Sequence, residues 1–176
     1  VNNAGIHDDA VFPGMSGEQW DRVLDVSLNG FFNVTQPLTM PMMRTRWGRI
    51  VSISSVAAVA GNRGQVNYSS AKGALHAASN SLALELASRG VTVNAVAPGY
   101  IETEMTSGLS EEVTAKIMAE IPLARLGSGD DVAAAVGRLT CVVIAKTHDL
   151  AGGFAVNDAI RRTKNGFDVS VVDDNA

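Results

Sequence analysis

Two short β-branched runs on either side of a long helical pattern constrain the fold of this chain more than any other feature. The runs, Arg49 to Ile53 and Val91 to Ala97, predict two buried strands. Between them, a loop of small residues leads into a helix predicted from about Tyr68 to Ser88, which Gly90 ends. Strands joined through a helix of this length run parallel, with a right-handed crossover. The pattern therefore predicts an α/β fold built on a parallel sheet.

A second long helix is predicted before the first of these strands. Ser16 begins a capping box that Gln19 completes, and apolar residues then recur at helical spacing towards Arg46. Prolines at positions 37 and 41 lie in its second half, where a proline removes an amide donor and clashes with the preceding turn. We therefore expect one helix from Ser16 to Arg46, with a kink or an early stop near Gln36.

The two ends of the chain carry weaker patterns. Val1 to Asn3 resembles the end of a strand that enters a turn, so we expect the sequence to be a piece of a longer protein. A loop and a short helix are expected from Ser107 to Ile121, and a further helix opens at Asp130. Phe154 to Val156 is a candidate edge strand. Residues 1–159 are expected to form one folded unit, and residues 160–176 an irregular tail.

Composition excludes several classes of protein. A hydrophobic content of 46% in 176 residues suffices for one sizeable core and excludes a disordered chain. The formal net charge of -4, without a long basic run, argues against nucleic-acid partners. The single cysteine, Cys141, cannot form an internal disulfide, and neither a signal peptide nor a membrane-spanning apolar run is visible. We expect a cytoplasmic protein with no nucleic-acid or membrane partner and no metal site.

The strongest chemical signal is the pair Tyr68 and Lys72, four residues apart at the start of the predicted helix and so on one face of it. A tyrosine can give a proton to a nascent alkoxide, but its ordinary pKa of about 10 makes it a poor donor near neutral pH. A lysine ammonium one turn away is expected to lower that pKa. The spacing alone arises by chance in roughly one chain of this composition in twenty, so it needs further support.

A serine at the end of the preceding strand supplies that support. Ser55 lies thirteen residues before Tyr68, where its hydroxyl can hydrogen-bond the same carbonyl oxygen. Ser52 and Ser54 are alternatives in the same segment, and a serine at a strand end is more often part of a turn than of a catalytic site. The Tyr and Lys that follow favour Ser55.

Further motifs lie in a fixed order around this set. They are Val1-Asn2-Asn3-Ala4-Gly5, Val93-Asn94 and the run from Pro98 to Thr103. Together with Ser55, Tyr68 and Lys72 they resemble the short-chain dehydrogenase/reductase family. Within it, the runs Gly61 to Tyr68 and Ile101 to Met105 are most similar to the beta-ketoacyl-[acyl-carrier-protein] reductases of fatty acid synthesis. The resemblance extends from Val1 to about Val136, and it is more specific for the family than for the substrate.

The resemblance implies a Rossmann-type, doubly wound parallel sheet whose N-terminal strands are absent here, with residues 1–159 as the C-terminal catalytic part of that domain. NADPH would donate the hydride. Tyr68 would be the general acid, Lys72 its activator and a donor to the nicotinamide ribose, and Ser55 would orient the carbonyl. The cofactor residues would be Asn3, Ala4 and Gly5 on the adenosine side, and Pro98, Gly99, Ile101 and Thr103 beside the nicotinamide.

Three departures from the family's pattern matter. The Gly-rich dinucleotide loop is absent, and with it the residues that choose NADP(H), so NAD(H) stays open. Ser27 stands where an Asn usually completes the catalytic set by holding a water in the proton relay. Asn29 lies about 200° further around the helix and cannot replace it. Beyond about Cys141 the chain matches the family poorly.

The resemblance also implies partners. The two long helices would pack against their copies in a homotetramer, and Arg46 and Arg89 match positions that dock an acidic acyl carrier protein. An arginine at a helix end is ordinarily a solvated cation, so the docking role stays open.

Four functions remain open: reduction of a 3-oxoacyl thioester on acyl carrier protein, reduction of acetoacetyl-CoA, another ketone reductase or alcohol dehydrogenase activity, and a non-catalytic fragment. The missing cofactor loop, Ser27 and the C-terminal stretch favour the last.

Overall fold

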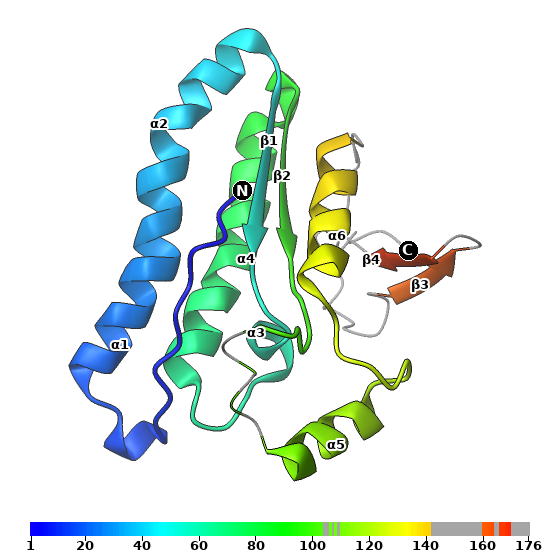
Figure 1. Ribbon diagram of the computed structural model, residues 1–176. Helices are drawn as coiled ribbons and strands as arrows, with labels where there is room; N and C mark the ends of the chain where they lie inside the picture. The colour runs from blue at the N-terminus through cyan, green and yellow to red at the C-terminus, as the bar shows by residue number, and fades with distance from the viewer. Residues whose placement is uncertain (104–105, 107, 109, 142–159, 164–165, 170–176) are drawn as a thin grey trace, which may run out of the picture.

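Two parallel strands form the centre of the protein in the computed structural model, which describes residues 1–103, 106, 108, 110–141, 160–163 and 166–169 (Figure 1). Strand β1 (Gly48–Ile53) pairs in parallel with β2 (Val91–Val96), with Ile50 opposite Val93. On the other side of β1, the Asn2 N–H donates to Val51 O at 2.8 Å and Asn2 O accepts from the Ile53 N–H at 2.9 Å. The predicted parallel sheet is confirmed, and Asn2 adds an isolated parallel bridge beside β1.

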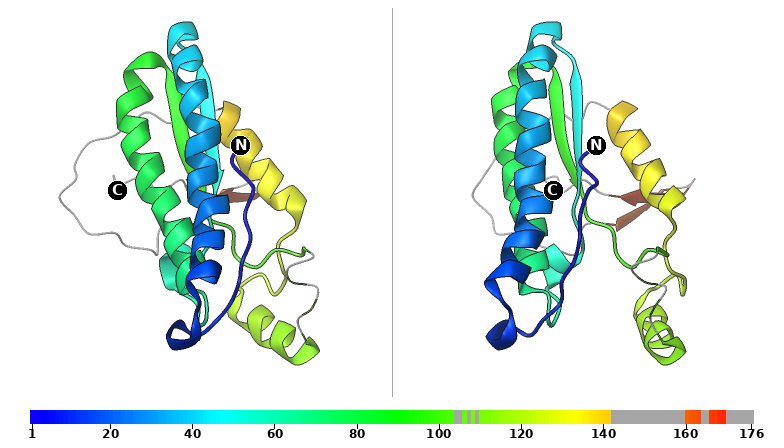
Figure 2. Two further views of the ribbon diagram at one scale, coloured as in Figure 1. Left: turned by 90° about the vertical axis from the view of Figure 1, so that its left-hand side faces the viewer. Right: turned by 60° about the vertical axis from the view of Figure 1, so that its left-hand side comes forward.

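Helices cover both faces of this sheet, as a doubly wound fold requires. The two turned views place α2 and α4 on one side of the strands and α6 on the other (Figure 2). One buried cluster joins Ile50, Val91 and Val93 to Leu86 of α4, and the opposite one joins Val51 and Val96 to Leu139 of α6. Each such side chain contributes about 1.5 to 3 kcal/mol when fully buried, so the two-sided core explains why apolar residues of these strands point to both faces of the sheet.

The long N-terminal helix departs from the prediction. The capping box is confirmed: Ser16 Oγ accepts from the Gln19 N–H at 3.1 Å, and Gln19 Oε1 accepts from the Ser16 N–H at 3.0 Å. Helix α1 (Gly17–Leu24) then passes through a π-helical segment (Asp25–Asn29) into α2 (Gly30–Thr45).

The expected early stop near Gln36 is wrong, because α2 continues through both prolines to Thr45. The carbonyls that lose an amide partner belong to Asn33 and Pro37, four residues before each proline. Both residues are exposed, so water can satisfy those carbonyls.

The second long helix agrees closely with the prediction. After the short α3 (Ala57–Ala60), α4 runs over Val66–Leu86, and a 3₁₀ turn (Ala87–Arg89) leads to Gly90. Gly90 has φ +71°, and a Cβ there would meet Arg46 O at 2.5 Å. Both the positive φ and the close approach of Arg46 O therefore require glycine at this turn. Because α4 returns antiparallel to the strands, its first turns lie at their carboxyl ends.

After β2, the described residues form two more helices and a pair of short strands. Helix α5 spans Glu111–Glu120, helix α6 spans Gly129–Cys141, and a parallel bridge joins Ile101 to Gly127. Strands β3 (Ile160–Thr163) and β4 (Gly166–Val169) pair antiparallel. The expectation of an irregular tail is wrong for the residues of these two strands, which include the strand-favouring residue types Ile160, Phe167 and Val169. The candidate strand Phe154 to Val156 lies outside the described residues. None of the helices in the described part of the chain is both long and apolar enough to span a membrane.

Candidate active site

The carboxyl end of β1 and the first two turns of α4 bring the predicted catalytic side chains together. Lys72 is 3% exposed, and its Nζ lies 5.7 Å from the centroid of the Tyr68 ring. Nζ donates to the carbonyl oxygen of Ile53, the last residue of β1, at 2.8 Å. Burial lowers the pKa of Lys72. The ammonium is thus fixed between a strand end and the phenol ring.

The three serines of this segment separate into different environments. Ser54 Oγ donates to Lys72 O at 2.9 Å, and Ser52 is completely buried beside Asn2. Ser55 is half-buried and its Oγ accepts from the Ala57 N–H at 3.2 Å. Ser54 therefore holds β1 against α4, whereas Ser55 is the serine that reaches Tyr68.

The acid strength of Tyr68 differs from the prediction. Burial raises the pKa of Tyr68 above its ordinary value, a hydrogen bond with Ser55 lowers it in part, and the charge of Asp9 raises it. The expected lowering of this pKa by Lys72 is wrong for the structure. Its ammonium is turned to the Ile53 carbonyl, and the half-buried phenol loses more hydration than the phenolate gains from charge. Tyr68 therefore keeps its proton at neutral pH, as a proton donor must.

The Asn3-Ala4-Gly5 segment lies beside Lys72. A Cβ on Gly5 would lie 2.8 Å from Lys72 Nζ, so the bare glycine makes room for the ammonium. Asn3 and Ala4 are exposed at the end of the strand that pairs with β1. The Ile53 carbonyl accepts from one of the three N–H groups of Lys72 Nζ. The other two N–H groups have no acceptor among the residues that the structure describes. A buried ammonium with spare donors beside a bare backbone fits the hydroxyl groups of a ribose.

Ser27 lies in the π-helical segment and is 4% exposed. Its Oγ has no hydrogen-bond partner in the described part of the chain. A cavity of about 120 Å³ is lined by Ser27 together with Asn3, Ala4 and Leu75. Asn29 is exposed and donates instead to Asp25, so it does not take the place of Ser27, as expected. π-Helical turns are frequent at functional sites, and no pattern in the sequence predicted this one.

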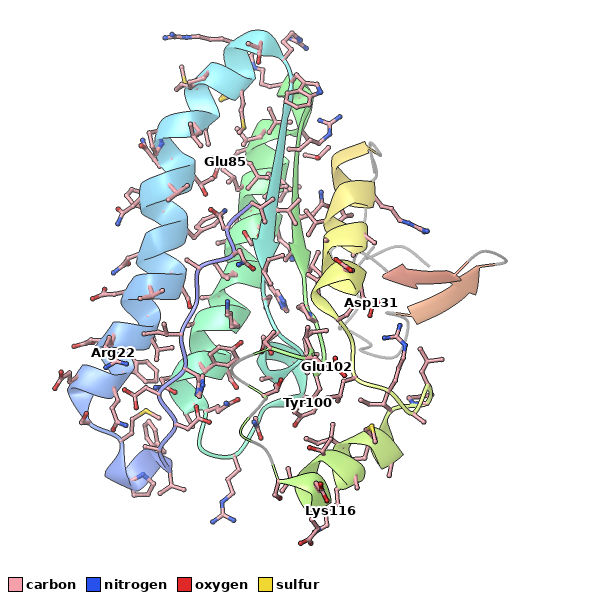
Figure 3. All side chains as sticks on the ribbon, in the orientation of Figure 1. Arg22, Glu85, Tyr100, Glu102, Lys116 and Asp131 are labelled. Carbon is pink, nitrogen blue, oxygen red and sulfur yellow. The ribbon has the colours of Figure 1, made fainter. Side chains whose placement is uncertain are left out.

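The segment after β2 borders the same end of the sheet. The Val56 N–H donates to Pro98 O at 2.9 Å, which holds this segment against the residue after Ser55. Gly99 and Thr103 are exposed, and Ile101 is tied to Gly127 through the parallel bridge. Figure 3 shows Tyr100 and Glu102 beyond the strand ends, whereas Glu85 lies on α4 towards the opposite end.

Arg46 and Arg89 lie at that opposite end. Arg46 Nη2 donates to Ser88 O at 3.1 Å, so the two arginines sit on adjoining turns. Arg89 follows Tyr68 by 21 residues along α4 and its 3₁₀ extension, a separation of about 30 Å. The structure therefore does not bring the predicted docking arginines to the site of the same chain.

Two features of the site were missed in the sequence. The Ile53 carbonyl that binds Lys72 is a backbone group, for which a sequence carries no signal. Asn67 is completely buried, and its position next to Tyr68 in the sequence is the signal that could have indicated it. Among the described residues, no group of three or more His, Cys, Asp or Glu side chains could hold a metal ion.

Known proteins match this chain over most of its length. Residues 1–141 match the short-chain dehydrogenase/reductase family model described as enoyl-(acyl carrier protein) reductase. The 3-oxoacyl-[acyl-carrier-protein] reductase FabG of Aquifex aeolicus (strain VF5) is 56% identical over 133 residues, which cover 76% of this chain and 54% of that protein. Nodulation protein G of Rhizobium sp. (strain N33) is 47% identical over 160 residues, which cover 89% of this chain and 65% of that protein.

A third relative, FabG of Escherichia coli (strain K12), is 46% identical over 139 residues, covering 79% of this chain and 57% of that protein. The chain spans 54% to 65% of the length of these relatives. The family match covers most of the chain and includes every residue of the site described above. The chain therefore belongs to the short-chain dehydrogenase/reductase family.

Proposed function

We propose that this chain supplies the catalytic part of an NADP(H)-dependent reductase that converts 3-oxoacyl thioesters on acyl carrier protein into 3-hydroxyacyl thioesters, in fatty acid synthesis. The observation that carries the proposal is the convergence of Ser55, Tyr68 and Lys72 at the carboxyl end of β1. Identity of 56% to a 3-oxoacyl-[acyl-carrier-protein] reductase supports the substrate class.

In this proposal, Ser55 and Tyr68 act on the ketone oxygen. The bound nicotinamide supplies a hydride to the ketone carbon. Ser55 donates a hydrogen bond that orients the carbonyl, and Tyr68 transfers its phenolic proton to the oxygen as negative charge develops there. Because burial raises the pKa of Tyr68, the donor is protonated when the substrate arrives. The product is a secondary alcohol.

Lys72 and the flanking loops hold the cofactor in the same proposal. The Ile53 carbonyl fixes Lys72 Nζ, whose remaining N–H donors would bind the ribose hydroxyls. Gly5 leaves the space that this ammonium occupies, and Asn3 and Ala4 continue the same edge. Pro98, Gly99, Ile101 and Thr103 would hold the nicotinamide end of the cofactor.

The test is a substrate comparison with the protein expressed from its complete reading frame. We expect oxidation of NADPH with 3-oxoacyl thioesters, a higher kcat/KM on acyl carrier protein than on CoA, and a lower kcat/KM with NADH. A preference for acetoacetyl-CoA would make the protein a CoA-linked reductase. Absence of turnover on either thioester would overturn the proposal.

Ser27 provides the first mutational prediction. Its unpartnered Oγ lines a cavity, which suits a water in the proton relay, but its side chain is shorter than asparagine. We expect Ser27→Asn to raise kcat about two- to tenfold with little change in KM, because the water affects proton resupply more than binding. Ser27→Ala, which removes only the hydroxyl, should lower kcat. An unchanged or lower kcat in Ser27→Asn would show that the site relays protons without this side chain.

The two arginines at the far end of α4 carry the proposal for the carrier protein. Because they lie about 30 Å from Tyr68 of the same chain, a carrier bound there reaches this site through a long arm or enters the site of a neighbouring copy. The proposed homotetramer would supply that copy. Its interfaces would use exposed apolar residues of the two long helices: Phe32, Leu38, Met40 and Leu84.

Charge reversal tests this docking surface. We expect Arg46→Glu and Arg89→Glu each to raise KM for carrier-bound substrate about tenfold, and the effect to weaken as salt is added. KM for a small thioester analogue should stay the same. Equal losses on both substrates would point to damage to the fold, since Arg46 also bonds Ser88 O.

A further inference from the structure

The side chain immediately before Tyr68 has a role that the proposed chemistry does not explain. Asn67 is 0% exposed and uses both ends of its amide. Its Nδ2 donates to Asp8 O at 2.9 Å and to Gln19 O at 3.2 Å, and its Oδ1 accepts from the Tyr68 N–H at 2.8 Å. A single buried side chain thus joins the loop after Gly5, helix α1 and the backbone of the proton donor.

Asn67 also completes the start of α4. The first N–H groups of a helix have no intrahelical acceptor, and a side chain at the N-cap usually satisfies one of them. Here the N-cap residue Gln65 makes no such bond, and its amide is hydrogen-bonded to Asn62 and Asp9 instead. The Tyr68 N–H is one of these groups, and Asn67 Oδ1 accepts from it. The first turn of α4 therefore depends on Asn67.

The acceptors of Asn67 are themselves fixed. Gln19 Nε2 donates to Asp8 Oδ1 at 2.7 Å, and Arg22, labelled at the foot of α1 in Figure 3, lies 3.7 Å from Asp8 Oδ2. Asp8 and Gln19 thus form a rigid pair, and Asn67 ties Tyr68 to it. Asp8 lies three residues after Gly5, which abuts Lys72 Nζ. The same bonds therefore set Tyr68 relative to the segment beside Lys72.

We infer that Asn67 is a positioning residue, which holds the Tyr68 phenol in line with the reacting carbonyl by anchoring its backbone to Asp8 and Gln19. The inference rests on the proposed function for its effect on turnover. It does not need that function for its effect on Tyr68 itself. Since a displacement of about 1 Å can cost a hundredfold in rate, loss of the anchor affects kcat rather than KM.

The experiment compares Asn67→Ala with Asn62→Ala in the protein expressed from its complete reading frame. Asn62 lies on the same loop, is exposed and bonds only Gln65, so it is the matched control. We expect Asn67→Ala to lower kcat per folded molecule at least about tenfold while KM changes less than about threefold. Asn62→Ala should leave both unchanged. Thermal melting measures the folded fraction in each sample.

A second readout follows Tyr68 directly. With ¹³Cζ-labelled tyrosine and the Tyr68→Phe protein to identify the signal, NMR gives the Tyr68 titration without any turnover. We expect Asn67→Ala to move that midpoint towards the ordinary tyrosine value by about half a pH unit, because the released ring regains water. Asn67→Asp keeps the acceptor for the Tyr68 N–H and places a carboxylate nearby, so the midpoint should move in the opposite direction.

The outcomes separate the two proposals. If Asn67→Ala leaves the titration midpoint of Tyr68 unchanged, the positioning role is overturned whether or not kcat falls. Any loss of rate would then arise from something other than the position of Tyr68. A moved titration with unchanged kcat overturns it as well. If the unsubstituted enzyme reduces no ketone but the titration still moves, the proposed function fails and the anchor of Tyr68 stands.

Discussion

Replacing Tyr68 with phenylalanine is expected to lower ketone reduction about a thousandfold while the fold survives. The substitution removes only the phenolic hydroxyl and keeps the half-buried ring that lies 5.7 Å from Lys72 Nζ. Because burial raises the pKa of Tyr68, the native donor is charged only when the pH rises through that raised value. In the unsubstituted enzyme, the contribution of Tyr68 should therefore hold through neutral pH and fall above the raised pKa. The measurement is NADPH oxidation across a pH series, with circular dichroism as the check on folding.

Tyr100 offers the matched control for this experiment. It is 41% exposed, lies beyond β2, and is the other tyrosine of the chain. Tyr100→Phe should change the rate less than about threefold, since loss of an exposed hydroxyl costs little. Turnover by Tyr68→Phe at the parental rate would remove Tyr68 from its assigned role.

Replacing Lys72 with alanine is expected to have the second largest effect, on cofactor affinity as well as on rate. A hydrogen bond to a charged group is worth about 1.5 to 3 kcal/mol, so loss of a ribose contact should weaken NADPH binding about ten- to hundredfold. The rate should fall further, because Lys72 also borders the Tyr68 ring. Binding is measured by the change in NADPH fluorescence, separately from turnover.

Lys116 serves as the control lysine. It lies on α5 and pairs with Glu112 at 2.7 Å, with both side chains exposed. Such a surface pair contributes little, so Lys116→Ala should leave cofactor affinity and rate unchanged. Unaltered NADPH affinity in Lys72→Ala would contradict the proposed contact between Lys72 and the ribose. The proposed role of Lys72 would then be limited to its effect on Tyr68.

The convergence of Ser55, Tyr68 and Lys72 could be predicted because it depends on local rules. Residues four apart on a helix share a face, and the start of a crossover helix lies at the carboxyl end of the strand before it. The same rules predicted both strands and the capping box at Ser16. Sequence resemblance then gave each residue a candidate role.

The predictions that failed depend on the surroundings of a residue. The pKa of Tyr68 follows from how much water its ring loses and from where the Lys72 ammonium is turned, and neither is visible in a four-residue spacing. The early stop that the prolines of α2 suggested does not occur, because their cost depends on the exposure of carbonyls four residues away. The strands β3 and β4 were not predicted, because residues 160–169 show no sustained alternation of apolar and polar side chains that would indicate a strand.

The π-helical segment makes the length of the chain at Asp25–Asn29 as important as its side chains. If one further residue were inserted there at ordinary α-helical spacing, everything before it would rotate by about 100° about the axis of α2. Gln19 O would then turn away from Asn67, and Asp8 would lose the donors that α1 presents to it. One added residue would thus dismantle the anchor of Tyr68 without altering any residue that contacts it.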